Sequence, residues 1–170
     1  NLARRDDGIK PEIAEVSPQF FKTTFANYEL IASENDRVFD YENRIYRPFM
    51  TDQLLLKQLM TILFDNAIKY TEEDGKIEFV VHATDRHLYL TVTDNGIGIS
   101  AADKKKIFDR FYRVDKARTR QKGGFGLGLS LAKQIVDALR GTISVKDNKP
   151  RGTIFEVKIA IQSPSKRKNK

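Results

Sequence analysis

A carboxylate followed by two glycines gives this sequence its clearest chemical signal, in the segment Asp94-Asn95-Gly96-Ile97-Gly98. The preceding residues 87–93 alternate apolar and polar side chains, which is the period of a half-buried strand. Asp94 therefore falls on the inward face at the end of that strand, where a carboxylate needs a partner. The glycines permit positive φ and let another group lie close to the backbone. The pattern favours a binding site, and a surface Asn-Gly turn is the alternative.

A second glycine cluster, at residues 123–128, opens a segment with helical periodicity. Backbone N–H groups at such a turn and helix start form a natural cradle for phosphate. Between the two clusters, residues 103–122 carry nine basic and three acidic residues, which puts positive charge where a polyanion would bind. Residues 116–122 have too few apolar side chains to pack, so we expect a lid that a ligand orders. This combination predicts a nucleoside triphosphate site.

A helix with an apolar stripe that turns polar toward its end is the third component. Thr51-Asp52 supplies the expected N-terminal cap, and leucines follow at helical spacing. Asn66, Lys69 and Tyr70 lie three and four residues apart, which brings an amide, an ammonium and a phenol onto one face. The alternative is a polar helix end that simply meets solvent.

Three further elements on the N-terminal side must support these groups. Ser17-Pro18 predicts the start of a helix whose aromatic residues recur at helical spacing and belong to a core. Residues 37–42 are predicted to form a short strand, and residues 43–50 a loop with room for another. Ile77, Phe79 and Val81 alternate along a strand that a loop at residues 84–86 joins to the central strand, as in a hairpin.

The C-terminal half supplies a short helix, a long helix and two strands. Ser100 can cap the short helix, and apolar residues at 107, 108 and 111 anchor it before the basic segment. A helix beginning at Leu127 ends at Gly141. Residues 142–145 and 153–161 are predicted to be closing strands, joined by a turn at residues 147–150.

Composition narrows the class of protein. The chain has 170 residues, with 40% hydrophobic and 31% charged side chains, which suits one globular domain. It has no cysteine, and we expect a cytoplasmic domain without direct membrane contact. The net charge of +7 lies mainly within the nucleotide motifs and the tail, which disfavours a nucleic-acid partner. We predict an upstream remnant at residues 1–16, one domain at residues 17–162 and a disordered basic tail at residues 163–170.

Four segments, in order, resemble the N, G1, F and G2 boxes of the catalytic domain of sensor histidine kinases. They are residues 65–71, 94–98, 107–115 and 124–129, and Gly152-Thr153 resembles the final glycine motif of that family. The similarity covers about residues 17–161. The wider class is the ATP-binding fold shared with gyrase, the Hsp90 chaperone and the MutL mismatch-repair proteins.

The resemblance implies an α/β fold, a two-layer sandwich with a mixed, mostly antiparallel sheet covered on one face by about three helices. It implies ATP bound between the Asn66 helix and the lid, with Asp94 accepting from the adenine amino group and Asn66 holding Mg²⁺. Lys69, Tyr70 and Arg113 would contact phosphates or the outer edge of the nucleotide. The implied catalytic residues are Asn66, Lys69 and Arg113. The implied nucleotide-binding residues are Asn66, Lys69, Tyr70, Asp94, Gly96, Gly98, Gly124, Phe125, Gly126, Leu127, Gly128, Leu129 and Thr153.

The family activity implied is transfer of the γ-phosphoryl group of ATP to a histidine. In that family the histidine lies on an upstream dimerisation hairpin of a homodimer, and the phosphoryl group passes to a response regulator receiver domain. The parent of such a domain is a membrane sensor. His82 and His87 fall in predicted strands and do not resemble the acceptor, so we expect no self-phosphorylation of this chain.

One position departs from the family pattern. Four residues before Asn66 the N box usually has a polar residue, but this chain has Ile62. Two alternatives to the kinase are an ATP-driven clamp of the gyrase, Hsp90 and MutL type, and a non-catalytic nucleotide-sensing module. A clamp predicts a general base in the N box, and a sensing module predicts a degraded lid. Ile62 is not a general base, which argues against the clamp, and the lid sequence is intact, which argues against the sensing module.

Overall fold

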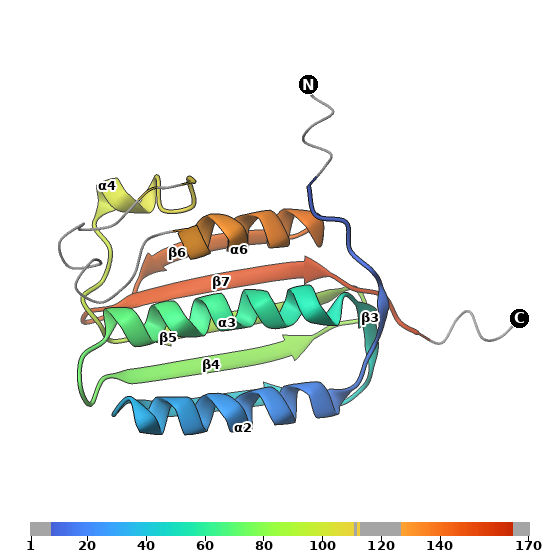
Figure 1. Cartoon of the computed structure of the whole chain (residues 1–170), viewed down its shortest axis with the longest axis horizontal. Helices are drawn as coiled ribbons and strands as arrows, with labels where there is room; N and C mark the ends of the chain where they lie inside the picture. The colour runs from blue at the N-terminus through green and yellow to red at the C-terminus, as the bar shows by residue number, and fades with distance from the viewer. Residues whose placement is uncertain (1–7, 111, 113–126, 165–170) are drawn as a thin grey trace, which may run out of the picture.

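Five strands form the sheet of the computed structural model, which describes residues 8–110, 112 and 127–164 (Figure 1). The strand order is β2-β4-β5-β7-β6. β2 runs parallel to β4, and every other neighbouring pair is antiparallel. The strands are β2 (Val38–Arg44), β4 (Lys76–Ala83), β5 (His87–Asp94), β6 (Thr142–Asp147) and β7 (Thr153–Ala160). This arrangement confirms the predicted mixed, mostly antiparallel sheet.

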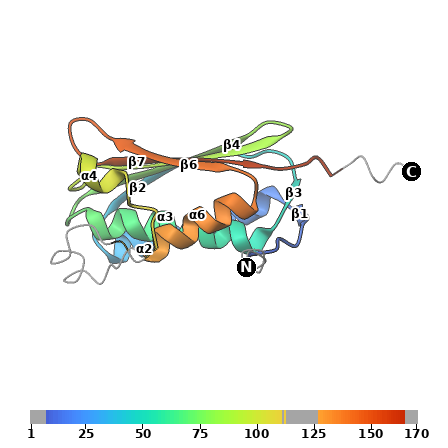
Figure 2. The same cartoon turned by 90° about the horizontal axis from the view of Figure 1, so that it is seen from above.

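Three long helices cover one face of this sheet, and its other face is open (Figure 2). They are α2 (Pro18–Glu34), α3 (Gln53–Tyr70) and α6 (Leu127–Ala138), and the short α4 (Ala101–Lys104) lies at one end. The predicted caps are present: the Ser17 hydroxyl accepts from Gln19 N, and Asp52 Oδ1 accepts from Leu55 N at 3.0 Å. Each cap satisfies an N–H group that the first helical turn leaves without a partner.

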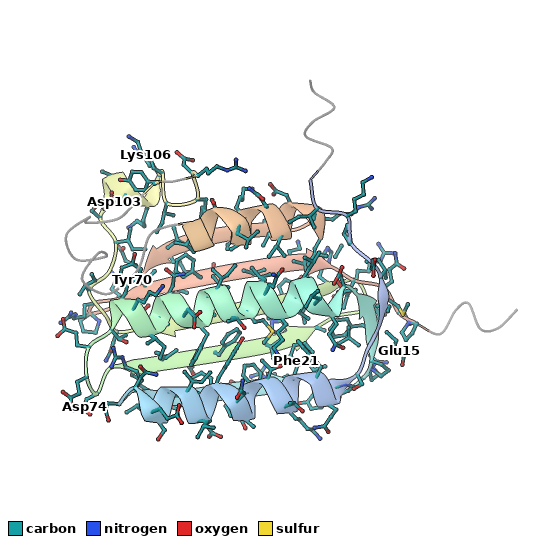
Figure 3. All side chains as sticks on the ribbon, viewed as in Figure 1. Glu15, Phe21, Tyr70, Asp74, Asp103 and Lys106 are labelled. Carbon is teal, nitrogen blue, oxygen red and sulfur yellow. The ribbon has the colours of Figure 1, made fainter. Side chains whose placement is uncertain are left out.

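The core fills the space between the helices and the sheet. β5 shows the predicted alternation, because Leu88, Leu90 and Val92 are buried while the residues between them are not. The aromatic residues of α2 point into the same space, as Figure 3 shows for Phe21. The ring of Tyr28 stacks on Phe64 of α3, with centroids 4.2 Å apart.

α3 buries more side chains than the leucines of its predicted apolar stripe. Met60 and Phe64 are also fully buried. α3 contacts α2 on one side, α6 on the other and β5 beneath, so three of its sides meet protein. A helix placed between neighbours in this way buries a wider face than a simple surface helix does.

A small antiparallel sheet of β1 (Ala14–Val16) and β3 (Phe49–Thr51) closes the end opposite the start of α6. The sequence analysis assigned residues 14–16 to the segment before the domain and did not anticipate β1. Val16 is buried in the core, and Glu12 N donates to Asp52 Oδ2 at 2.8 Å. Among the described residues, no helix combines the length and hydrophobicity that crossing a membrane requires.

Candidate functional site

Asp94 ends β5 as a buried carboxylate, with 4% of its surface exposed. Its Oδ1 accepts two hydrogen bonds, from Gly96 N at 2.8 Å and from Thr153 N at 3.3 Å. Burial raises the pKa of Asp94 to about 6, and these two amides and the charge of Arg151 oppose that rise. The group is therefore ionised at neutral pH. Within the described part of the chain, both donors use Oδ1, and Oδ2 is left to accept from a ligand.

The glycines after Asp94 have two different structural roles. A β-carbon on Gly96 would lie 2.0 Å from the carbonyl oxygen of Tyr70, so this position admits only glycine because of close approach. Gly98 has φ +77°, which favours glycine for its conformational freedom. Asn95 prolongs the pairing with β4, since its Oδ1 accepts from Lys76 N at 2.8 Å. The segment is thus a continuation of the sheet that leads toward α4, and the alternative of a surface hairpin turn is wrong.

The polar end of α3 lies beside this loop. Ile97 N donates to Tyr70 O at 2.9 Å, which ties the loop to the last turn of the helix. The Tyr70 side chain is buried, whereas Asn66 and Lys69 are half-buried. Asn66 Nδ2 donates to Ile62 O at 2.9 Å, so its Oδ1 is the atom turned toward other partners. The two motifs predicted to share a site therefore do lie together.

The first turn of α6 lies against α3 at Ile62, which is one helical turn before Asn66. A β-carbon on Gly128 would stand 3.4 Å from Ile62 Cγ2, an ordinary contact, and Leu129 is buried. Leu127 begins α6. Of the other predicted residues in the glycine-rich and basic segments, Arg113, Gly124, Phe125 and Gly126 lie outside the described residues, as does the expected lid at residues 116–122.

The segment that leads into the basic run is anchored at the same end of the molecule. Figure 3 shows Tyr70, Asp103 and Lys106 at this end. Ser100 caps α4 by accepting from Asp103 N at 3.1 Å, as predicted. Ile107 is buried, and the ring of Phe108 meets Phe155 edge-on with centroids 6.3 Å apart. These contacts place the start of the basic segment next to the loop that follows Asp94.

The turn between β6 and β7 contributes residues that the sequence analysis did not select. Asn148 Nδ2 donates to Asp94 O at 2.9 Å, and Arg151 Nε donates to Gly96 O at 2.9 Å. Gly152 has φ +113°, and a β-carbon there would lie 1.9 Å from Asp94 O. Only Gly152-Thr153 was recognised from the sequence. The roles of Asn148 and Arg151 had no local signal, because polar residues are common in any turn.

A third residue that sequence reasoning missed closes the end of α3. The guanidinium of Arg37 donates to Thr71 Oγ1 at 2.7 Å, Thr71 O at 2.9 Å and Ile68 O at 3.0 Å. It also donates to Asn35 O at 2.6 Å. The last carbonyl groups of a helix have no partner within it, so Arg37 satisfies them while linking the α2–β2 corner to the site.

Other features of the described residues lie away from this site. His82 is exposed on the open face of the sheet, where its ring stacks on Tyr89 with centroids 4.8 Å apart. His87 is also in a strand, as predicted. A depression of about 1200 Å³ is lined by Met50, Arg86 and Gln162 among others.

Similarity to known proteins extends over almost the whole chain. The family model described as histidine kinase-, DNA gyrase B-, and HSP90-like ATPase matches residues 51–163. Sensor protein CiaH of Streptococcus pneumoniae is 82% identical over 168 residues, which are 99% of this chain and 38% of that protein. The chain thus spans well under half the length of this relative.

Solved structures of similar fold agree with this match. The catalytic domain of histidine kinase ThkA superposes with a TM-score of 0.74 at 26% identity, covering 90% of this chain and 99% of that one. ThkA in complex with the response regulator protein TrrA gives a TM-score of 0.72 at 26% identity, covering 92% of this chain and 44% of that one. These likenesses confirm the resemblance drawn from the four sequence motifs.

Proposed function

Because this chain belongs to the family of histidine kinase-, DNA gyrase B- and HSP90-like ATPases, we propose that it is the catalytic domain of a sensor histidine kinase. It binds Mg-ATP and transfers the γ-phosphoryl group to a histidine on an upstream dimerisation hairpin of a homodimeric parent. A response regulator receiver domain then takes the phosphoryl group. The parent is a membrane sensor, and this domain is its cytoplasmic part, with neither nucleic acid nor direct membrane contact. The similarity to the sensor protein CiaH and to ThkA, which is known in complex with the response regulator TrrA, supports the proposal.

The environment of the Asp94 carboxylate is the main support for this proposal. It is buried and ionised at neutral pH, and two backbone amides occupy one of its oxygens. The other oxygen is an acceptor in a water-poor place, where a donor on a ligand forms a charge-assisted hydrogen bond. The amino group of adenine is such a donor. Guanine has a carbonyl oxygen at the equivalent ring position, which the carboxylate would repel, so the site selects adenine nucleotides.

Asn66 fits the role of a magnesium ligand. Its Nδ2 is engaged by Ile62 O, which leaves the amide oxygen, a ligand type that Mg²⁺ accepts. Among the described residues, no group of three or more acidic or histidine side chains could hold a metal ion, so the ion would depend on Asn66 and on phosphate oxygens. When bound, Mg²⁺ neutralises charge on the phosphoryl group being transferred.

The remaining predicted residues would surround the nucleotide. Gly96, Gly98 and Thr153 would shape the wall next to the base, because Gly96 and Thr153 lie against Asp94 and Gly98 lies against Gly152. Lys69 and Tyr70 would contact phosphates or the outer edge of the nucleotide. Residues 124–129 would wrap the triphosphate, and Arg113 would add positive charge. Together they would position the γ-phosphoryl group and neutralise its charge, which is the main task in phosphoryl transfer.

Ile62 supports the kinase over the clamp. Its half-buried side chain packs against the core and lies beside Gly128, one turn before Asn66. A hydrocarbon side chain cannot take a proton from water, which a clamp-type ATPase requires at this position. A kinase benefits from this lack, because water that attacks first would waste the phosphoryl group.

A transfer assay tests the proposed function. The chain is mixed with a separately made helical hairpin that carries the acceptor histidine, Mg²⁺ and labelled ATP. We expect acid-labile label on the hairpin and none on this chain. A hairpin with its histidine replaced by alanine is the control. Label that appears on this chain alone would contradict the proposal, as would binding of ATP without transfer to any acceptor hairpin tested.

A further inference from the structure

The turn between β6 and β7 holds the loop that follows Asp94 from the outside. Asn148 and Arg151 each donate a side-chain hydrogen bond of 2.9 Å to a backbone carbonyl of that loop, on Asp94 and Gly96 respectively. The turn is itself fixed, because Asn148 N donates to Gly152 O at 3.0 Å. The loop is therefore held between the end of α3 on one side and this turn on the other.

Arg151 also acts on Asp94 through its charge. It is the cation whose field opposes the effect of burial on the pKa of Asp94. Three other cations of the described residues, on α3, β4 and α4, interact with acidic groups of their own. The charge of Lys69 on α3 opposes the rise that burial causes in the pKa of Asp65. Lys76 Nζ of β4 lies 3.7 Å from Asp40 Oδ2, and Lys104 Nζ of α4 lies 2.6 Å from Asp147 Oδ1. Tyr70, whose carbonyl oxygen accepts from Ile97 N, is a further titratable residue beside the loop.

We propose that Arg151 is a positioning residue for adenine recognition, because it fixes the Gly96 carbonyl and so holds the loop that follows Asp94. The proposal rests on the proposed nucleotide-binding function and deepens it. Arg151 does not touch the reacting atoms; it acts through Asp94. It precedes the Gly152-Thr153 motif and belongs to none of the four boxes recognised in the sequence.

Two effects of Arg151 can be separated by substitution. Arg151→Gln removes the charge, whereas Arg151→Lys retains the charge but not the planar Nε–H group. Lys149→Gln is the matched control, because it removes a positive charge from the same turn at an exposed residue with no ion pair among the described residues. Arg151 is exposed, so solvent weakens both effects and we expect modest changes.

The experiment uses the whole chain and two readouts. Carbon-13 NMR follows the titration of the Asp94 carboxyl without nucleotide, and calorimetry follows ADP binding with Mg²⁺ from about pH 5.5 to 8. We expect Arg151→Gln to raise the pKa of Asp94 and to weaken ADP about threefold to tenfold at pH 7.5, with a larger loss near pH 6. Arg151→Lys should leave the pKa of Asp94 unchanged and should lose only part of the affinity for ADP. Lys149→Gln should match the unmodified chain in both readouts.

The outcomes distinguish this inference from the function on which it rests. If the unmodified chain binds no adenine nucleotide, the proposed function fails, and the role of Arg151 in adenine recognition fails with it. If the unmodified chain binds ADP and Arg151→Gln matches Lys149→Gln in affinity at every pH and in the pKa of Asp94, only the inference on Arg151 is overturned. The same NMR spectra report whether each variant is folded, so a loss of affinity through unfolding is recognised.

Discussion

Gly96 lies against Tyr70 so closely that a β-carbon at Gly96 would stand 2.0 Å from the Tyr70 carbonyl oxygen. The next residue, Ile97, donates its amide to the same oxygen at 2.9 Å. The end of α3 and the loop after β5 are thus joined through their backbones, without any side chain between them. Two segments proposed to bind the nucleotide keep a fixed relative position before a ligand arrives.

Gly96→Ala should therefore destabilise the protein. The atoms that the new methyl group meets belong to the backbone and cannot turn aside, so we expect a loss of about 2 kcal/mol or more in the free energy of unfolding. Urea denaturation measures it. Gly128→Ala is the matched control, because its methyl group would make only ordinary contact at 3.4 Å with Ile62. Equal stability of the two variants would show that the loop can move away from α3.

Asp94→Asn should weaken adenine nucleotides by on the order of tenfold to a hundredfold, because a charge-assisted hydrogen bond is lost. The asparagine oxygen can still accept from the amides of Gly96 and Thr153, so the loop should remain in place. Calorimetry with ADP and Mg²⁺ measures the affinity, and a circular dichroism spectrum checks the fold. A folded variant that binds ADP as well as the unmodified chain would refute the adenine assignment.

The same substitution should change how the stability of the nucleotide-free protein depends on pH. The pKa of Asp94 is raised from 3.8 to about 6 in the folded state, so its contribution to stability is present below pH 3.8 and is lost as the pH rises through 6. Asparagine has no such loss. The stability of Asp94→Asn relative to the unmodified chain should increase by on the order of 1–3 kcal/mol between pH 4 and pH 7.5.

Urea denaturation of both proteins at those two pH values checks this expectation. A difference in stability that does not change with pH would mean that Asp94 titrates alike in the folded and unfolded states.

Ile62→Glu should raise futile ATP hydrolysis, because it introduces a general base one helical turn before Asn66. We expect slow phosphate release by the unmodified chain and faster release by the variant, without better transfer to a supplied histidine hairpin. Ile62→Gln is the matched control, because glutamine resembles glutamate in size and polarity but cannot act as a general base. Asn66→Ala is the blank. Brisk phosphate release by the unmodified chain would favour the clamp over the kinase.

Arg37→Lys should cost about 1–3 kcal/mol of stability, although the charge is retained. An ammonium cannot reproduce the four hydrogen bonds that the guanidinium makes to Asn35, Ile68 and Thr71. Thermal denaturation measures the loss. Arg86→Lys is the comparison, because Arg86 is exposed and its side chain makes no hydrogen bond or ion pair within the described residues. Equal melting temperatures would contradict the role given to Arg37.

Local patterns predicted most of the elements and much of the candidate site. The alternation along β5 placed Asp94 on the buried face, because strand periodicity continues to the last residue of the strand. The caps Ser17, Asp52 and Ser100 lie where short polar side chains precede helical periodicity. Each of these signals lies within a few residues of the feature that it specifies, which is why sequence alone was sufficient.

Tertiary structure decided the features that depend on residues far apart in the chain. The parallel pairing of β2 with β4, the small sheet of β1 and β3, and the burial of Phe64 depend on which elements become neighbours. No local pattern encodes that choice.

The support around Asp94 was decided in the same way. Asn148 and Arg151 are ordinary turn residues in the sequence, and Arg37 was expected only to begin a strand. Each became part of the site when the sheet brought β5 beside β7 and the end of α3 beside the α2–β2 corner. The sequence by itself determined which groups could do the chemistry. The packing of distant segments determined which groups hold them in place, because those hydrogen bonds exist only after the chain has closed.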